Sequence, residues 1–113
     1  MNDTEMIFQR LMAVIEERRA NPSEKSYTSK LLTGGVEAIG EKIMEEAGEV
    51  VDAARESDPD AHKHLIHEAA DLIYHLLVML GHKNVQLVEV EAELAVRFGM
   101  SGLDEKASRT DGA

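Results

Sequence analysis

Two acidic clusters within helical stretches are the clearest candidates for chemistry in this sequence. They are Glu45-Glu46-Ala47-Gly48-Glu49 and, after eighteen intervening residues, Glu68-Ala69-Ala70-Asp71. Because successive helical residues turn by about 100°, Glu46 and Glu49 lie about 60° apart on one helix face, as do Glu68 and Asp71. If the two helices pack antiparallel with these faces together, four carboxylates converge, and a hard divalent cation is needed to offset their charge. The pattern predicts a magnesium site.

The surroundings of the second cluster strengthen this prediction. Glu68 and Asp71 lie among Ala, Leu and Ile residues, where an unpaired carboxylate costs several kcal/mol and is rarely tolerated. One alternative stays open, in which Lys30 and Lys42 neutralise the carboxylates as structural ion pairs. Oxygen ligands favour Mg²⁺, with Mn²⁺ as a possible substitute, over iron or zinc.

The histidines do not form a recognisable metal motif. His62, His64 and His67 have no fourth ligand at a fixed spacing, and the sequence contains neither His-Glu-x-x-His nor Glu-x-x-His. We therefore expect these three histidines on the surface. His75 follows Asp71 by one helical turn, and we expect it to be a core histidine or to support the site without binding metal.

Composition excludes several classes of function. The 113 residues include 12 basic and 22 acidic residues, for a net charge of −10, which argues against nucleic acid or an anionic membrane as a partner. No cysteine is present, so disulfides, thiolate zinc sites and thiol nucleophiles are absent. The longest apolar run, 72–80, is far short of the roughly 20 residues of a membrane span. Residues 1–5 lack the features of a secretory signal, and we expect a cytoplasmic protein.

Apolar residues recur at helical spacing through most of the chain, and no sustained strand pattern occurs. We predict helices at 4–20, capped by Asn2 or Asp3; at 36–57; from Asp58-Pro59 to Gly81; and from an Asn84 cap to Phe98, closed by Gly99. Residues 27–32 are predicted to form a short helical turn that is stopped by Gly34-Gly35. The chain is thus predicted to be one all-α domain, 1–113, a bundle of four to five helices with a polar tail from about residue 100.

Helical-wheel positions separate the acidic residues of the second helix. Glu46, Glu49 and Lys42 border its apolar stripe, whereas Glu45 lies further towards solvent. The third helix is apolar almost all round, which is typical of a central helix. In the fourth helix, Leu87, Val90, Leu94 and Phe98 are expected to face inward. So much apolar surface on a small domain predicts that a homodimer or a dimer-based oligomer completes the bundle.

Four segments of the sequence resemble the phosphoribosyl-ATP pyrophosphatases of histidine biosynthesis. They are Ser26–Leu31, Lys42–Glu49, Glu68–Val78 and Glu105–Arg109. The Glu-Glu-x-x-Glu and Glu-x-x-Asp motifs alone resemble those of the wider superfamily of all-α, MazG-like nucleotide pyrophosphohydrolases. The flanking segments narrow the resemblance to the phosphoribosyl-ATP pyrophosphatases. Met44 departs from it, because many relatives carry a small residue there.

The resemblance implies a hydrolase that uses Mg²⁺ to convert 1-(5-phosphoribosyl)-ATP into 1-(5-phosphoribosyl)-AMP and pyrophosphate. Glu46, Glu49, Glu68 and Asp71 would bind the metal, which would position an attacking water.

Further roles are expected for neighbouring side chains. Glu45, with Glu46 and Glu49, would take part in catalysis by orienting the water, while Lys30, Lys42 and Tyr27 would bind the substrate. Two other functions stay open at this point: a house-cleaning nucleoside triphosphate pyrophosphohydrolase and a non-catalytic helical interaction module.

Overall fold

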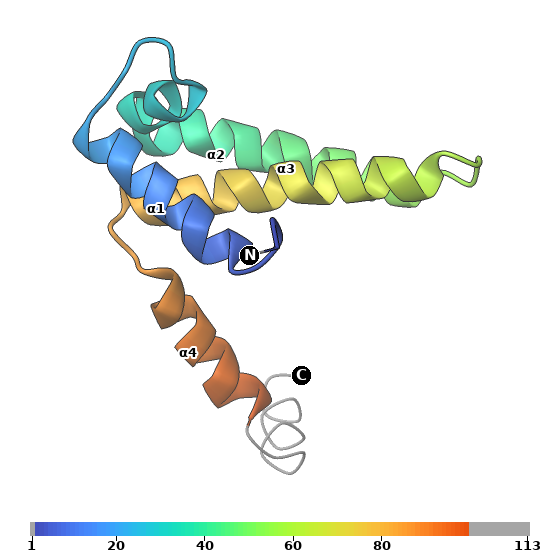
Figure 1. Cartoon of the computed structure of the whole chain (residues 1–113). Coiled ribbons are helices and arrows are strands. Elements are labelled where there is room, and N and C mark those ends of the chain that lie inside the picture. Colours follow the sequence, from blue (N-terminus) through green and yellow to red (C-terminus); the bar gives the residue numbers. More distant parts are fainter. Residues whose placement is uncertain (1, 100–113) are drawn as a thin grey trace.

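The computed structural model describes residues 2–99 and contains four helices in that range (Figure 1). They are α1 (Ile7–Ala20), α2 (Tyr27–Ala54), α3 (Ala61–His82) and α4 (Leu87–Phe98). The prediction of an all-α fold is confirmed. The predicted polar tail and the segment Glu105–Arg109 lie outside the described residues.

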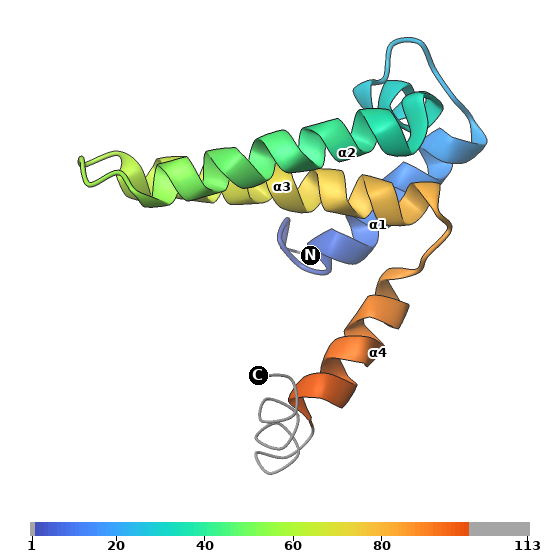
Figure 2. The same ribbon diagram turned by 180° about the vertical axis from the view of Figure 1, so that it is seen from behind.

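The long helices α2 and α3 form an antiparallel hairpin that organises the molecule (Figures 1 and 2). α1 packs across one end of this hairpin, and α4 leaves the end of α3 and points away from it. The radius of gyration is 16.7 Å, against about 13 Å for a compact chain of this length. The chain is therefore more extended than a domain with a complete core of its own. None of the helices in the described part combines the length and the apolarity needed to cross a membrane.

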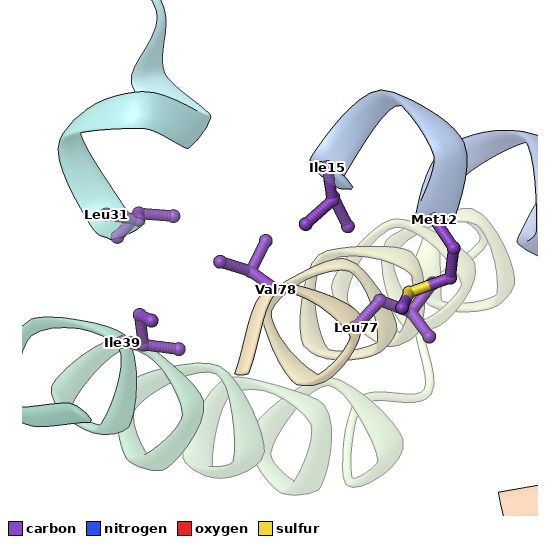
Figure 3. Packing of buried hydrophobic residues seen from close by; sticks show 6 residues of the cluster. All are labelled: Met12, Ile15, Leu31, Ile39, Leu77 and Val78. Atoms are coloured by element: carbon purple, nitrogen blue, oxygen red, sulfur yellow. The ribbon is translucent and has the colours of Figure 1, made fainter. Parts of the chain in front are cut away.

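The apolar core lies where α1, the start of α2 and the end of α3 meet (Figure 3). Ile15, Ile39 and Val78 are fully buried there. Gly81 allows α1 to approach α3 closely, since a Cβ atom at this position would lie 2.6 Å from Cγ2 of Ile15. The predicted role of Gly81 as the helix stop is wrong by one residue, because α3 continues to His82.

α2 contains the break that the sequence predicts. Ser26 caps its first turn by accepting a hydrogen bond from the backbone N–H of Ser29, at 3.1 Å. Gly35 then interrupts the helix with φ 72° and ψ −160°, a backbone conformation that is accessible to glycine and strained for other residues. The second part ends at Ala54 rather than residue 57, since the N–H groups of Arg55 and Glu56 bond to carbonyls only three residues back.

The first helix begins later than predicted. α1 starts at Ile7 rather than residue 4, and neither Asn2 nor Asp3 caps it. The side chain of Asn2 instead accepts a hydrogen bond from the Thr4 N–H at 3.0 Å, which forms a local turn of a kind that asparagine favours. Met6 has a positive φ of 51° at the helix start.

The starts of α3 and α4 also differ from the predictions. Asp58 accepts a hydrogen bond from the Asp60 N–H at 2.9 Å, so Asp58-Pro59 forms the hairpin turn and α3 begins at Ala61.

Asn84 adopts a positive φ of 58° and does not cap α4. Gln86 caps it in a reciprocal capping box with Glu89, a stronger arrangement because two backbone groups are satisfied at once. Gly99 ends this helix, as predicted.

The apolar side of α4 is largely uncovered. Leu87 packs against the core and Val90 is partly buried. Leu94 and Phe98 are 50% and 48% exposed, so the prediction that they face inward is wrong for the single chain. Within the described part of the chain, no residue of α4 is fully buried.

Candidate metal centre and active site

Two of the predicted metal ligands lie inside the hairpin, between α2 and α3. Glu68 on α3 is only 9% exposed, and Glu46 on α2 is partly buried, with its Oε2 atom shielded from solvent and without a hydrogen-bond partner. A shielded carboxylate oxygen without a donor is costly in a protein. An oxygen-binding cation is the kind of group that satisfies it.

The carboxylates of Glu46, Glu68 and Asp71 are close enough to affect one another. Burial raises the pKa of Glu46, and the nearby Glu68 and Asp71 carboxylates raise it further. The structure thus brings three of the four predicted ligands together. Their mutual repulsion without metal, and the uncompensated oxygen of Glu46, fit the binding of a divalent cation.

Asp71 forms the open side of this group. Its side chain is 41% exposed, compared with 11% for Glu68. One ligand atom from each of His67, Glu68 and Asp71 lies within 4.8 Å of the other two. The group therefore runs from the buried Glu68 and the partly buried Glu46 to a solvent-facing edge at Asp71 and His67.

Histidines, rather than lysines, are the basic partners of these carboxylates. Nε2 of His64 lies 3.4 Å from Oε1 of Glu68, and Nε2 of His67 lies 3.4 Å from Oδ2 of Asp71. A hydrogen bond to Glu56 at 2.9 Å raises the pKa of His64. The expected surface position is confirmed for His62 and His67, and His64 is partly exposed, but His64 and His67 also contact the acidic group. Their i,i+4 spacing from Glu68 and Asp71 is a signal in the sequence that could have found both contacts.

Lys42 forms its ion pair with Glu45 and not with Glu68 or Asp71. Its Nζ lies 3.5 Å from Oε2 of Glu45, on the side of α2 towards solvent. Within residues 2–99, Lys30 is exposed and takes part in no ion pair. The alternative in which Lys30 and Lys42 serve as structural counter-ions of Glu68 and Asp71 is therefore wrong.

The remaining acidic candidates on α2 lie apart from the buried group. Glu45 and Glu49 are both exposed. Glu49 is one helical turn beyond Glu46 and does not join the donor group formed by the α3 residues. Its predicted role as a metal ligand stays a prediction.

A hydrogen-bonded chain connects the start of α2 to the turn of α3 that carries Glu68 and Asp71. Nδ1 of the buried His75 lies 2.7 Å from the backbone oxygen of Asp71, and Nε2 lies 2.9 Å from the Tyr27 hydroxyl. Since a carbonyl oxygen only accepts, Nδ1 donates, and Nε2 of the neutral ring accepts the tyrosine proton. Burial raises the pKa of Tyr27, which favours the protonated donor. The predicted core position of His75 is thus confirmed, and its ring contacts the backbone of Asp71.

An aromatic cluster surrounds this chain. The rings of Tyr27 and Tyr74 stack with centroids 6.2 Å apart, and Tyr74 meets His75 edge-on at 4.9 Å. The Thr28 and Tyr74 hydroxyls also share a hydrogen bond. Tyr27 remains 48% exposed, so part of its ring is available to a ligand beside the carboxylates.

Most of the chain is similar to known proteins of one family. The family model described as phosphoribosyl-ATP pyrophosphohydrolase matches residues 8–98. The chain is 50% identical over 109 residues to a phosphoribosyl-ATP pyrophosphatase of Rhodopirellula baltica, covering 96% of this chain and 91% of the relative. It is 48% identical to one of Geotalea daltonii, covering 96% and 98%. It is also 47% identical to a histidine biosynthesis bifunctional protein HisIE of Helicobacter hepaticus, covering 91% of this chain and 43% of that protein.

Proposed function

The chain belongs to the phosphoribosyl-ATP pyrophosphohydrolase family, and on that premise we propose a magnesium-dependent hydrolysis of 1-(5-phosphoribosyl)-ATP to 1-(5-phosphoribosyl)-AMP and pyrophosphate. The enzyme is a hydrolase of a phosphoanhydride bond in histidine biosynthesis. The observation that carries the proposed metal dependence is the shielded, unpartnered oxygen of Glu46 beside Glu68 and Asp71.

Glu46, Glu68 and Asp71 would hold the cation, with Glu49 contributing from the next turn of α2. Bound Mg²⁺ supplies charge neutralisation for the polyphosphate and a polarised water. The exposed edge at Asp71 admits the phosphates, while the buried Glu68 keeps the inner side of the site in place. Mn²⁺ is expected to substitute, since it accepts the same oxygen ligands.

The chemical step is an attack by water on the α-phosphorus. A P–O bond forms to the water oxygen, the bond from the α-phosphorus to the α–β bridging oxygen breaks, and pyrophosphate leaves. The proton that the water loses passes to a carboxylate of α2. Because Glu46 and Glu49 are assigned to the metal, we assign this proton to Glu45, which is exposed to solvent beside them.

Basic and aromatic groups of α2 complete the proposed substrate site. Lys42 is close enough to Tyr27 for each to affect the pKa of the other. We assign Lys42 to the phosphate chain and the half-exposed ring of Tyr27 to the substrate beside it. Lys30 lies one helical turn beyond Tyr27, further from the carboxylates.

A second copy of the chain is proposed to cover the exposed apolar surface. The uncovered side chains lie on α2, α3 and α4: Val36, Met44, Val51, Ile66, Ile73, Leu76, Val88, Leu94, Val96 and Phe98. Together with the extended shape of the chain, they indicate an incomplete core. Sedimentation at micromolar concentration should give a homodimer or a dimer-based oligomer, and a monomer would contradict this proposal.

The activity is tested by measuring pyrophosphate release from phosphoribosyl-ATP. The wild type should turn over with Mg²⁺, lose activity in EDTA and regain it with added Mg²⁺. Asp71→Asn and Glu49→Gln should each lower the rate by more than about tenfold, or about 1.4 kcal/mol of barrier. Rates within tenfold of wild type would remove the affected residue from the site. A panel of nucleoside triphosphates run alongside distinguishes this activity from house-cleaning hydrolysis.

A further inference from the structure

Two adjoining cavities lie beside the first part of α2, away from the carboxylates. One, of 510 Å³, is lined by Pro22, Ser23, Glu24, Ser29, Lys30 and Thr33. The other, of 320 Å³, shares Pro22, Ser29 and Thr33 with the first and is also lined by Arg18, Arg19, Leu32 and His82. We refer to the two together as the basic hollow, because Arg18, Arg19 and Lys30 line it in a chain with a net charge of −10.

The arginines of the basic hollow are held only by exposed contacts. Arg18 pairs with Glu17, and Arg19 pairs with Glu16 at 3.1 Å and donates to Oδ1 of Asn84 at 3.2 Å. Exposed ion pairs of this kind contribute between zero and about 1 kcal/mol. A dianionic phosphate can therefore compete for both guanidinium groups, whose planar N–H donors suit its oxygens.

A row of side chains leads from the metal centre to the basic hollow. Tyr27, Lys30 and Thr33 follow each other at i,i+3 spacing, so they lie along one side of the helix over about 9 Å. Tyr27 at one end contacts His75, which in turn bonds to the backbone of Asp71. Lys30 and Thr33 at the other end line the larger cavity. One elongated ligand can thus reach both places.

The substrate of the proposed function has two anionic ends. Its triphosphate requires the carboxylate-bound cation, and the 5-phosphate of its second ribose is separated from the triphosphate by the adenine and the sugars. We propose that the basic hollow binds this ribose 5-phosphate, with Arg18, Arg19 and Lys30 as its cationic ligands. The assignment rests on the proposed function, and it makes the basic hollow the part of the site that distinguishes phosphoribosyl-ATP from ATP.

Direct binding tests the basic hollow without any hydrolysis. Ribose 5-phosphate, titrated into the wild-type protein and followed by NMR, should shift the backbone amides of Ser23, Ser29 and Thr33. The double variant Arg18→Gln/Arg19→Gln should weaken this binding at least tenfold. Arg55→Gln is the matched control, because Arg55 is an exposed, ion-paired arginine just after the end of α2, and it should bind as the wild type does.

Adding and removing a negative charge in the basic hollow should change the affinity for ribose 5-phosphate in opposite directions. Thr33→Glu should abolish ribose 5-phosphate binding by repulsion, whereas Glu24→Gln should tighten it two- to threefold by removing the one carboxylate that lines the larger cavity. Both residues are exposed, so both variants are expected to fold. Unchanged affinity in both variants would overturn the proposal.

Steady-state kinetics connect the basic hollow to the substrate. Arg18→Gln/Arg19→Gln should raise KM for phosphoribosyl-ATP at least tenfold and leave kcat within about threefold, while Arg55→Gln changes neither. A wild type that hydrolyses phosphoribosyl-ATP but shows no shifts with ribose 5-phosphate, or a double variant with unchanged KM, would overturn this inference alone. A wild type that does not hydrolyse phosphoribosyl-ATP would overturn the proposed function instead.

Discussion

The two halves of the α2–α3 hairpin differ in what holds the helices together. Under α1, the fully buried Ile15, Ile39 and Val78 pack without any polar partner (Figure 3). Further along the same helices, Glu68 is buried and Glu46 is partly buried, and burial together with the neighbouring Glu68 and Asp71 carboxylates raises the pKa of Glu46. We therefore expect the apolar half under α1 to carry most of the stability. The acidic half is suited to binding a cation rather than to stabilising the metal-free chain. Stability and function are thus separated along one pair of helices.

Shortening a side chain in the apolar half should have the largest effect on stability. Ile39→Ala should lower the free energy of unfolding by about 2–5 kcal/mol, because Ile39 is fully buried and the lost methyl groups leave a cavity. Ile39→Val should cost only about 1 kcal/mol. Urea titration measures both. A loss below about 0.5 kcal/mol for Ile39→Ala would show that this half does not carry the stability of the chain.

Removing the charge of Glu46 in the acidic half should raise the stability of the metal-free protein. The folded-state pKa of Glu46 is raised above its ordinary value of 4.5, so the metal-free folded chain binds a proton more tightly than the unfolded chain. Glu46 therefore costs stability increasingly as pH rises above about 4.5 towards its folded pKa. Glu46→Gln should be more stable than the wild type at pH 8 without metal, and the difference should vanish near pH 4.

Thermal melts of the two proteins across this pH range provide the measurement. Adding Mg²⁺ at pH 8 should stabilise the wild type more than Glu46→Gln, because the cation binds the folded carboxylates. A wild type that is more stable than the variant at pH 8 without metal would contradict the repulsion between Glu46 and its neighbours.

The sequence was sufficient for some of the positions that depend on periodicity, although Leu94 and Phe98 are not buried as their spacing predicts. Helical spacing placed Glu46 beside Glu68 and Asp71, and glycine chemistry placed the break in α2 at Gly35, where φ is 72°. Helix starts were less predictable, because several residues compete for the same role. Asn2 and Asp58 form local turns instead of capping α1 and α3. Gln86 displaced Asn84 at α4 because it shares a capping box with Glu89.

The structure identified the basic hollow, and it decided among the roles that the spacing of the histidines leaves open. His64 and His67 contact Glu68 and Asp71 along α3 itself, but a lone histidine four residues from a carboxylate has many other possible roles. The basic hollow combines the end of α1, the first part of α2 and His82 of α3. Apart from His82, its members lie between Arg18 and Thr33, on both sides of the connection between α1 and α2, so the periodicity of a single helix does not group them.

Calorimetric titration of Mg²⁺ into the metal-free protein tests the proposed metal centre most directly, with Glu68→Gln as the paired variant. Glu68 is the most buried of the carboxylates in this group, and its conversion to an amide removes one charge with little change of shape. The wild type should bind Mg²⁺ saturably, and Glu68→Gln should weaken this binding at least tenfold. Equal binding by both proteins, or hydrolysis of phosphoribosyl-ATP by the wild type in excess EDTA, would contradict a metal centre at Glu46, Glu68 and Asp71.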